Sequence, residues 1–434
     1  MRVWLRLFLW PLVLLSSVAG AQAADEYSFD ASTFEKKPFE LGGYVQAEGD
    51  VLGVQQDSVL GRLLAADQAN QNQVNRATGV LQLVGKVSYE SLSFRFLAYS
   101  AASTDQVQTQ SSSKFYEADL AYQVTDGVTL NAGKRVMRWG TGYAWNPVGF
   151  VERPKDPNDL SLPRQGYVMA TGDFVKSNVG PFATLALNAV VLPANSSVND
   201  TFGQGSHTNV AAKLYALVAD TDIDLMGLAN GSRPGRVGFD FSRNVSTNFE
   251  VHGEWARIFD FQQPVLDASG SVATRTANVS SWLLGARYLT ERDVTWIAEY
   301  YRNGTGYDQD ELEAFLRFGD AALAQAPPGI LIPLVQRAAS LARSNYGQPN
   351  PGRDYLYLRA SAKEPGNILY FTPSVTAIMN VQDKSFTLTP EVIYTGFNNW
   401  ELRARGVWLH GTSYTDFGER QFDYRIELYA RYYF

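Results

Sequence analysis

The feature that most constrains the fold is a period-two alternation of apolar and polar residues, which is clearest at the end of the chain. From Phe422 to Phe434, apolar or aromatic side chains occupy every second position. The charged residues of this stretch all fall on the other face: Asp423, Arg425, Glu427 and Arg431. Successive side chains of a β-strand point to opposite faces of its sheet. Charges on one face only fit lipid outside and water inside, so the pattern predicts a strand of a transmembrane β-barrel.

The same alternation recurs along the chain in segments of about 9 to 13 residues separated by turn residues. In Phe386 to Tyr394 the polar face carries Glu391, and in Glu401 to His410 it carries Arg403 and Arg405. Counting such segments gives about 18 strands, with 16 also compatible, and single-chain bacterial barrels have even strand numbers. The predicted fold is therefore all-β: a single antiparallel up-and-down transmembrane barrel.

Connections between these segments alternate between short turns and long loops, as in outer-membrane barrels, whose turns are periplasmic and whose loops are extracellular. Long loops are predicted at residues 51–76, 140–164, 194–206, 261–275, 304–352 and 411–421. Within 304–352, residues 308–325 and 330–341 have apolar side chains at helical spacing and predict two short amphipathic helices. Loop 140–164 is rich in proline and aromatic residues, and two placements stay open: folded into the barrel as an eyelet, or capping it from outside.

The amino terminus has the pattern of a secretory signal peptide, with Arg2 and Arg6, an apolar run from Leu7 to Val18, and a cleavage site after Ala23. The run is shorter than the ~20 apolar residues that a spanning helix requires, which disfavours a membrane anchor. We therefore expect a signal peptide at 1–23, a periplasmic segment at 24–37 and the barrel at 38–434.

A soluble all-β protein, either a sandwich or a propeller, is the main alternative to a membrane barrel, because antiparallel sheets also alternate. A globular core needs apolar residues on the inward faces of its strands. In these strands the inward faces are charged and the outward faces are apolar. No blade-length repeat is found either. The 9 Trp, 23 Tyr and 24 Phe favour a barrel, which places aromatic girdles at both membrane interfaces.

The last strand resembles the carboxy-terminal signature of outer-membrane barrel proteins, with terminal Phe434 preceded at alternate positions by Tyr432, Ala430, Leu428 and Ile426. That resemblance implies insertion by the barrel-assembly machinery into the outer membrane of a Gram-negative bacterium. Over its whole length the chain resembles the class of roughly 18-stranded porin-like channels, such as the alginate exporter and the substrate-specific porins. It matches neither motif by motif, so no substrate residue is carried over.

By strand parity, ten basic and 13 acidic residues, Glu254 among the acids, point into the lumen, so the two signs nearly balance. Ten residues of this set are singled out as candidates for the pore lining. The residues predicted to line the pore are Arg95, Arg135, Arg287, Glu299, Glu391, Arg403, Arg405, Arg425, Glu427 and Arg431. In one interpretation they create a transverse field across a constriction that orients charged solutes. In the other, neighbouring strands simply pair them, because the lipid face rejects Arg or Lys near the midplane at a cost of ~2 to 4 kcal/mol. The last three strands supply the strongest candidate for a selectivity patch: Glu391, Arg403, Arg405, Arg425, Glu427 and Arg431.

Several other function classes are disfavoured. The absence of cysteine removes thiolate chemistry and cysteine-based metal sites. Loss of the signal peptide leaves 35 basic against 44 acidic residues, a net charge of −9 that argues against nucleic-acid binding. The three histidines, His207, His252 and His410, define neither a nucleophile nor a metal triad, so no enzyme, cofactor or metal is expected.

Two functions remain. The first is a passive outer-membrane channel for hydrophilic solutes or an exported polymer. The second is a non-conducting barrel with a structural, surface-binding or partner-sheathing role. Outer-membrane lipid is the expected environment in both. The identity of the solute and the oligomeric state stay open, because an apolar trimer contact has the same composition as a lipid-facing surface.

Overall fold

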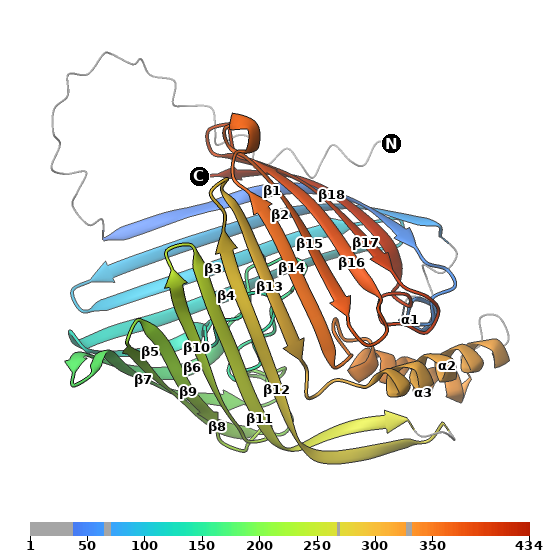
Figure 1. Cartoon of the computed structure of the whole chain (residues 1–434), viewed down its shortest axis with the longest axis horizontal. Helices are drawn as coiled ribbons and strands as arrows, with labels where there is room; N and C mark the ends of the chain where they lie inside the picture. The colour runs from blue at the N-terminus through green and yellow to red at the C-terminus, as the bar shows by residue number, and fades with distance from the viewer. Residues whose placement is uncertain (1–37, 65–70, 267–269, 327–331) are drawn as a thin grey trace. The chain divides into compact units, whose positions relative to one another are not determined.

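The computed structural model describes residues 38–64, 71–266, 270–326 and 332–434; the predicted signal peptide and the segment 24–37 lie outside them. Within these ranges, 18 antiparallel strands each pair with their sequence neighbours, and β18 pairs with β1, which closes a barrel (Figure 1). The predicted fold class and strand number are confirmed. The strands are β1 (Phe39–Val54), β2 (Gln73–Tyr89), β3 (Leu92–Thr104), β4 (Thr109–Thr125), β5 (Val128–Arg135), β6 (Tyr167–Val179), β7 (Phe182–Ala194), β8 (His207–Val218), β9 (Thr221–Leu228), β10 (Arg236–Ser246), β11 (Phe249–Leu266), β12 (Val272–Leu289), β13 (Val294–Arg302), β14 (Asp354–Ala362), β15 (Phe371–Asn380), β16 (Phe386–Tyr394), β17 (Trp400–His410) and β18 (Phe422–Tyr433).

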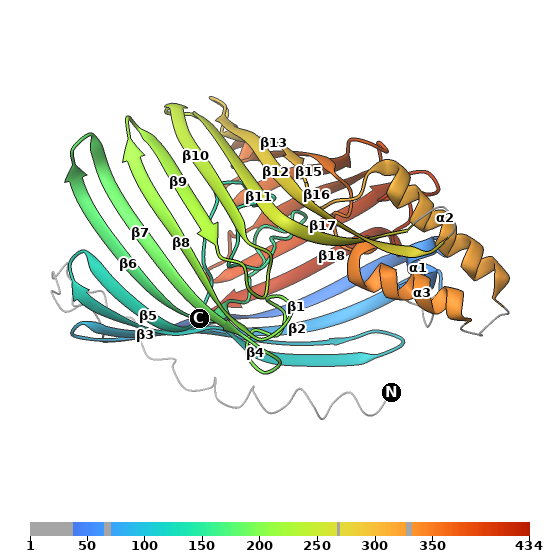
Figure 2. The ribbon, with the colours of Figure 1, turned by 90° about the horizontal axis from the view of Figure 1, so that it is seen from below.

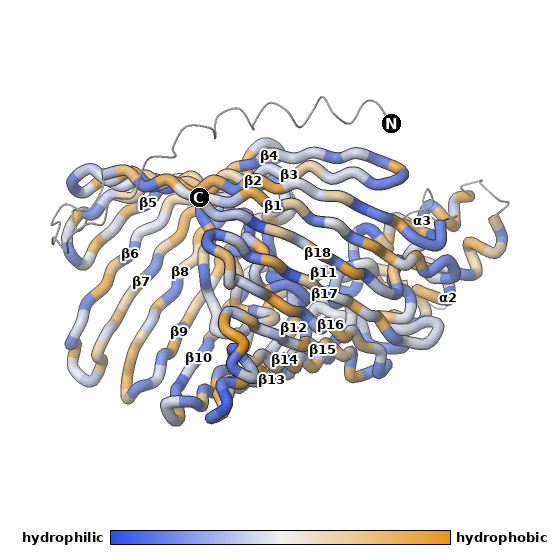
Figure 3. The backbone as a smooth tube through the Cα atoms, turned by 90° about the horizontal axis from the view of Figure 1, so that it is seen from above, coloured by the Kyte–Doolittle hydropathy of each residue, from blue (hydrophilic) through white to orange (hydrophobic). Residues whose placement is uncertain are grey.

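The two faces of the barrel wall follow the alternation in the sequence. In β18, Ile426 and Leu428 are 44% and 59% exposed and point outward, whereas Glu427 and Tyr429 are buried. Figure 3 shows hydrophilic and hydrophobic residues alternating along the strands. Because neighbouring strands are in register, inward side chains of adjacent strands lie side by side, as Glu427 does with Arg405 of β17. This register brings charged side chains from several strands together on the inner face.

The two ends of the barrel differ in the length of their connections. One end carries turns such as 90–91, 126–127 and 219–220, and the other carries the long connections 55–72, 136–166 and 303–353. The predicted long loop 261–275 is wrong: β11 and β12 stay paired out to Leu266 and Val272. Two polar residues, Gln262 and Gln263, followed by Pro264 indicate a loop, but this part of β11 pairs on one side only, where proline is tolerated.

The helices of the long connections pack together at the end of the barrel that carries those connections (Figure 2). The two predicted helices are confirmed as α2 (Gln309–Gln325) and α3 (Pro333–Leu341), and Asp308 forms a capping box at the start of α2. Helix α1 (Val59–Leu64) and the short η4 (Ala342–Tyr346) and η5 (Pro365–Asn367) were not predicted. None of the helices in the described residues has the length and apolar character of a membrane span.

Candidate functional site

Residues 136–166, which join β5 to β6, fold into the lumen, so the eyelet placement holds for this loop (Figure 2). We call this segment the strap. Its first part packs on the wall next to it, with Trp139, Val148 and Phe150 almost fully buried against residues that include Tyr167 and Leu192. Burying these side chains stabilises the docked strap by roughly 1.5 to 3 kcal/mol for each large residue.

Glu254 of β11 holds the strap on the first of two lumen walls. One carboxylate oxygen accepts the backbone N–H groups of Thr141 and Gly142 at 2.7 and 2.6 Å, and the other accepts that of Val148 at 3.3 Å. Gly140 permits the approach: its φ of +94° favours glycine, and a Cβ there would lie 2.7 Å from the carboxylate. The buried carboxylate therefore has its charge satisfied by the strap backbone.

Glu299 of β13 extends the same contact. Its oxygens accept the backbone N–H groups of Tyr143 and, at 2.8 Å, Ala144. His252 of β11 is fully buried, with Nε2 3.0 Å from Glu299 and Nδ1 3.5 Å from Glu250. The imidazole is thus enclosed between carboxylates that position the strap, and it has no exposed surface for a substrate.

Asp159 holds the strap on a second part of the wall, at β17, which lies four strands from β13 and six from β11 around the barrel. Its Oδ2 lies 2.6 Å from Arg405 and 3.1 Å from Arg403, both on β17, and all three side chains are almost fully buried. Burial raises the pKa of Asp159, but the two guanidinium groups and hydrogen bonds from Ser161 outweigh it and hold the pKa at about 2. In turn Arg403 pairs with Glu391 of β16. The strap therefore crosses the lumen as a tether between two walls.

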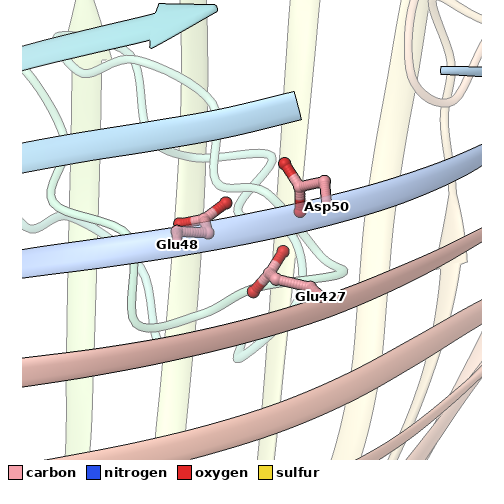
Figure 4. Close-up of side chains that lie close together, drawn as sticks. All are labelled: Glu48, Asp50 and Glu427. Atoms are coloured by element: carbon pink, nitrogen blue, oxygen red, sulfur yellow. The ribbon is translucent and has the colours of Figure 1, made fainter. Parts of the chain in front are cut away.

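The ion pairs continue from β17 to β1. Figure 4 shows Glu48 and Asp50 of β1 and Glu427 of β18 close together, with one carboxylate oxygen of each within 4.8 Å of the others. Arg425 Nη2 lies 3.1, 3.0 and 2.8 Å from these three carboxylates, and Arg405 lies 2.7 Å from Glu427. Two guanidinium groups thus offset three carboxylates, and Arg425 takes the position that a free cation would need.

The predicted selectivity patch is therefore assembled in large part. The strap and the inner wall join five of its six members: Glu391, Arg403, Arg405, Arg425 and Glu427. The sixth, Arg431, lies apart, where it donates hydrogen bonds to Gln46 at 2.7 and 2.9 Å and lies 3.6 Å from Glu401.

The remaining predicted pore residues lie on other parts of the wall. Arg95 of β3 pairs with Asp119 at 3.1 Å. Arg135, at the end of β5, donates a hydrogen bond to Thr171 at 2.9 Å. Arg287 of β12 lies beside the Tyr143 hydroxyl of the strap. Glu299, the last of the ten, is the strap contact described above.

The strap leaves cavities on either side of it. One of about 740 Å³ lies between the strap, α1 and strands β17 and β18, with Asp159, Leu162, Arg405 and Arg425 in its wall. A second of about 460 Å³ lies between the strap, strands β10 to β13 and the base of the helical loop. A third of about 370 Å³ is lined by the strap itself. All three have the size of small-molecule sites, about 300 to 1,000 Å³.

Strand parity gave the inward face of Glu299, Arg403 and Arg405, but it did not predict that they hold the strap. It placed Glu254 on the inner face but gave it no partner, and Asp159 was read only as part of a loop. The signal that could have found the first contact is the pair Gly140 and Gly142, which lets a backbone approach a buried acceptor closely.

Comparisons with known proteins address the fold. No protein-family model matches the chain, and no curated protein matches it. Among solved structures it is similar to OccK5 (OpdH) of Pseudomonas aeruginosa, with a TM-score of 0.51 and 12% identity over 91% of this chain and 98% of that one. It is also similar to OpdQ of the same organism, with a TM-score of 0.53 and 11% identity over 92% and 99%. At this identity the likeness shows a shared barrel fold, which is porin-like as the sequence resemblance implied.

Proposed function

We propose that this protein is a passive outer-membrane channel for small hydrophilic solutes. The observation that carries the proposal is the strap: a loop inside a closed barrel, held by buried charges on two separate parts of the wall, at β11 and β13 and at β17. A barrel of this width is wide enough to enclose a water-filled lumen. A loop folded into that lumen narrows it, and selection in a pore is set at its narrowest ring.

The outer face supports a membrane location. Outward residues such as Leu428, Leu284 and Trp296 are apolar and more than half exposed in the isolated chain. Covering such a surface with lipid removes it from water at about 25 cal/mol per Å². In an outer membrane, the long connections of such a barrel face outward from the cell and the short turns face the periplasm. The last strand, β18, carries the terminal pattern that resembles the sequence read by the assembly machinery.

The strap favours small solutes over an exported polymer. A polymer in transit would occupy the lumen continuously. For as long as it passed, it would have to displace the part of the strap that lies between its contacts with Glu254 and with Arg405. A small solute can pass beside the strap through spaces the size of the cavities described above. Enclosure of His252 on all sides likewise supports a channel over an enzyme.

Planar-bilayer recording of the purified full-length protein tests the proposal. We expect unitary current steps, and a shift of reversal potential in a salt gradient that reports ion preference. The competing function, a non-conducting barrel with a structural or surface-binding role, predicts no steps. Absence of steps both for the intact chain and after deletion of residues 308–345, which removes the helical cover, contradicts the channel.

A further inference from the structure

The 460 Å³ cavity beside β10 to β13 has a composition unlike the rest of the lumen. Its wall combines amide side chains, such as those of Asn303 and Asn350, with aromatic rings, including Trp145 and Tyr301, which stack at 5.2 Å. Trp145 donates its indole N–H to the side-chain oxygen of Asn350 at 3.1 Å, which leaves the amide N–H₂ of Asn350 as a donor. The side chain of Asn303 is already used, since its Nδ2 donates to the carbonyl oxygens of Asn350 and Gly352. Of these two amides, Asn350 therefore offers the open donor, and its neighbour Trp145 fixes its orientation.

The cavity also carries an excess of positive charge. Four charged residues line it: Glu152, Lys155, Arg233 and Arg236. The carboxylate of Glu152 is already taken, since it pairs with Arg164 and accepts the backbone N–H of Trp139 at 2.6 Å. In the described part of the chain, neither Arg233 nor Arg236 has a carboxylate within ion-pair distance. By contrast, the arginines on β17 and β18 near Asp159 all have one: Arg403, Arg405 and Arg425.

The two arginines differ in what holds them. Arg233 donates to the carbonyl oxygens of Phe202 and Phe150 and to the Tyr167 hydroxyl, so part of its role is to join loops. Arg236, at the inward-facing start of β10, donates its Nε to the carbonyl of Pro234 at 3.1 Å, and its guanidinium carbon lies 5.8 Å from the centre of the Phe150 ring. Within the described residues, neither terminal nitrogen of Arg236 has a hydrogen-bond acceptor, so both are open to a ligand.

Retaining two unpaired guanidinium groups together is costly for the protein alone. A partly buried charge loses hydration, and two like charges repel more strongly where the surroundings are less polar than water. Burial lowers the pKa of Arg233 from its ordinary value, which Tyr167 partly opposes and Arg153 reinforces. An anion between the two guanidinium groups removes both costs and gains charge-assisted hydrogen bonds.

We propose that this cavity binds a small hydroxylated anion, with its carboxylate or phosphate on Arg233 and Arg236 and its hydroxyl groups on the amide-lined wall. The volume suits a molecule of the size of a monosaccharide acid. The proposal deepens the proposed function, on which it rests for the origin of the ligand: the anion is a solute that enters the lumen. Binding itself does not require conduction, so the two proposals fail separately.

Calorimetric titration of the full-length protein in detergent tests the site, with glucuronate as the carboxylate probe, glucose 6-phosphate as the phosphate probe and glucose as the uncharged match. We expect at least one acid to bind about tenfold or more tightly than glucose, which is the range of one hydrogen bond to a charged group. The two acids distinguish a carboxylate ligand from a phosphate ligand. If neither binds more tightly than glucose, the proposal is wrong, whatever the channel conducts.

Arg236→Gln separates binding from structure. We expect acid binding to weaken about tenfold or more, with glucose binding unchanged and the melting temperature of the ligand-free protein equal or higher, since an unpaired charge is removed. Arg337→Gln, the same charge change at an exposed position on α3, should leave all three measurements unchanged. A lower melting temperature with intact acid binding in Arg236→Gln would mean that Arg236 is structural and would overturn the site.

Discussion

Asp159→Asn removes the one strap charge that bridges Arg403 and Arg405 while keeping the shape of the side chain. The Asp159 pKa is held at about 2, against an ordinary value of 3.8. Each unit of pKa corresponds to 1.36 kcal/mol, so the ionised carboxylate stabilises docking of the strap by about 2 kcal/mol. Its loss lowers the ratio of docked to undocked strap roughly thirtyfold.

Single-channel recording measures this change directly. We expect Asp159→Asn to show larger or noisier open-channel current than the wild type, because the strap leaves the β17 wall more often. Asp156→Asn is the matched control: the same charge change in the same loop, at an exposed residue that caps a local turn through the Asn158 N–H. Identical currents for wild type and Asp159→Asn would refute the reasoning.

The pH dependence of the same pair gives an independent check. The pKa of Asp159 is lower in the docked strap than in a free one, so its contribution is complete above about pH 5 and is lost as the pH falls through 2. The difference in melting temperature between wild type and Asp159→Asn should therefore stay constant from pH 8 to about 5 and shrink below. A difference that vanishes by pH 6 would show that another group carries the contact.

Three further changes test the other parts of the structure. Glu254→Gln leaves one acceptor oxygen for three strap N–H groups and should cost about 1 to 3 kcal/mol, seen as faster hydrogen exchange across the first half of the strap; unchanged exchange would contradict the contact. Gly140→Ala should lower the melting temperature, because its Cβ meets the Glu254 carboxylate, whereas Gly180→Ala, which also has positive φ but open space, should cost less. Leu428→Arg, on the outer face, should destabilise refolding into lipid vesicles by about 2 to 4 kcal/mol if it lies near the midplane, and no loss would place this face elsewhere.

The fold could be predicted closely because the residue pattern of each strand depends on what its own two faces meet, lipid on one side and the lumen on the other. Apolar and charged faces alternate within one strand, so Phe386–Tyr394 was predicted at the bounds that β16 has in the structure. The distal part of β11 and β12 was missed because it lies beyond the pairing with β10, where the alternation is weak and Pro264 is tolerated. Six-residue α1 is too short to give a helical period.

The strap could not be placed from sequence for a different reason. Its eyelet and cap placements have the same local pattern, and the groups that decide between them are distant in the chain. Asp159 meets Arg405 across 246 residues, and Thr141 meets Glu254 across 113. Strand parity gave the inward face of Arg405 and Glu254, but only the closed barrel shows which loop reaches them.

Leu162→Cys offers the most direct test that the strap lies in a conducting lumen. The chain has no cysteine of its own, and Leu162 is 49% exposed toward the cavities beside the strap. A bulky water-soluble thiol reagent added during bilayer recording should reduce the unitary current of Leu162→Cys. It should leave unchanged that of Val107→Cys, at the exposed tip between β3 and β4. Current that is absent, or unaffected after labelling of Leu162→Cys, would contradict the account.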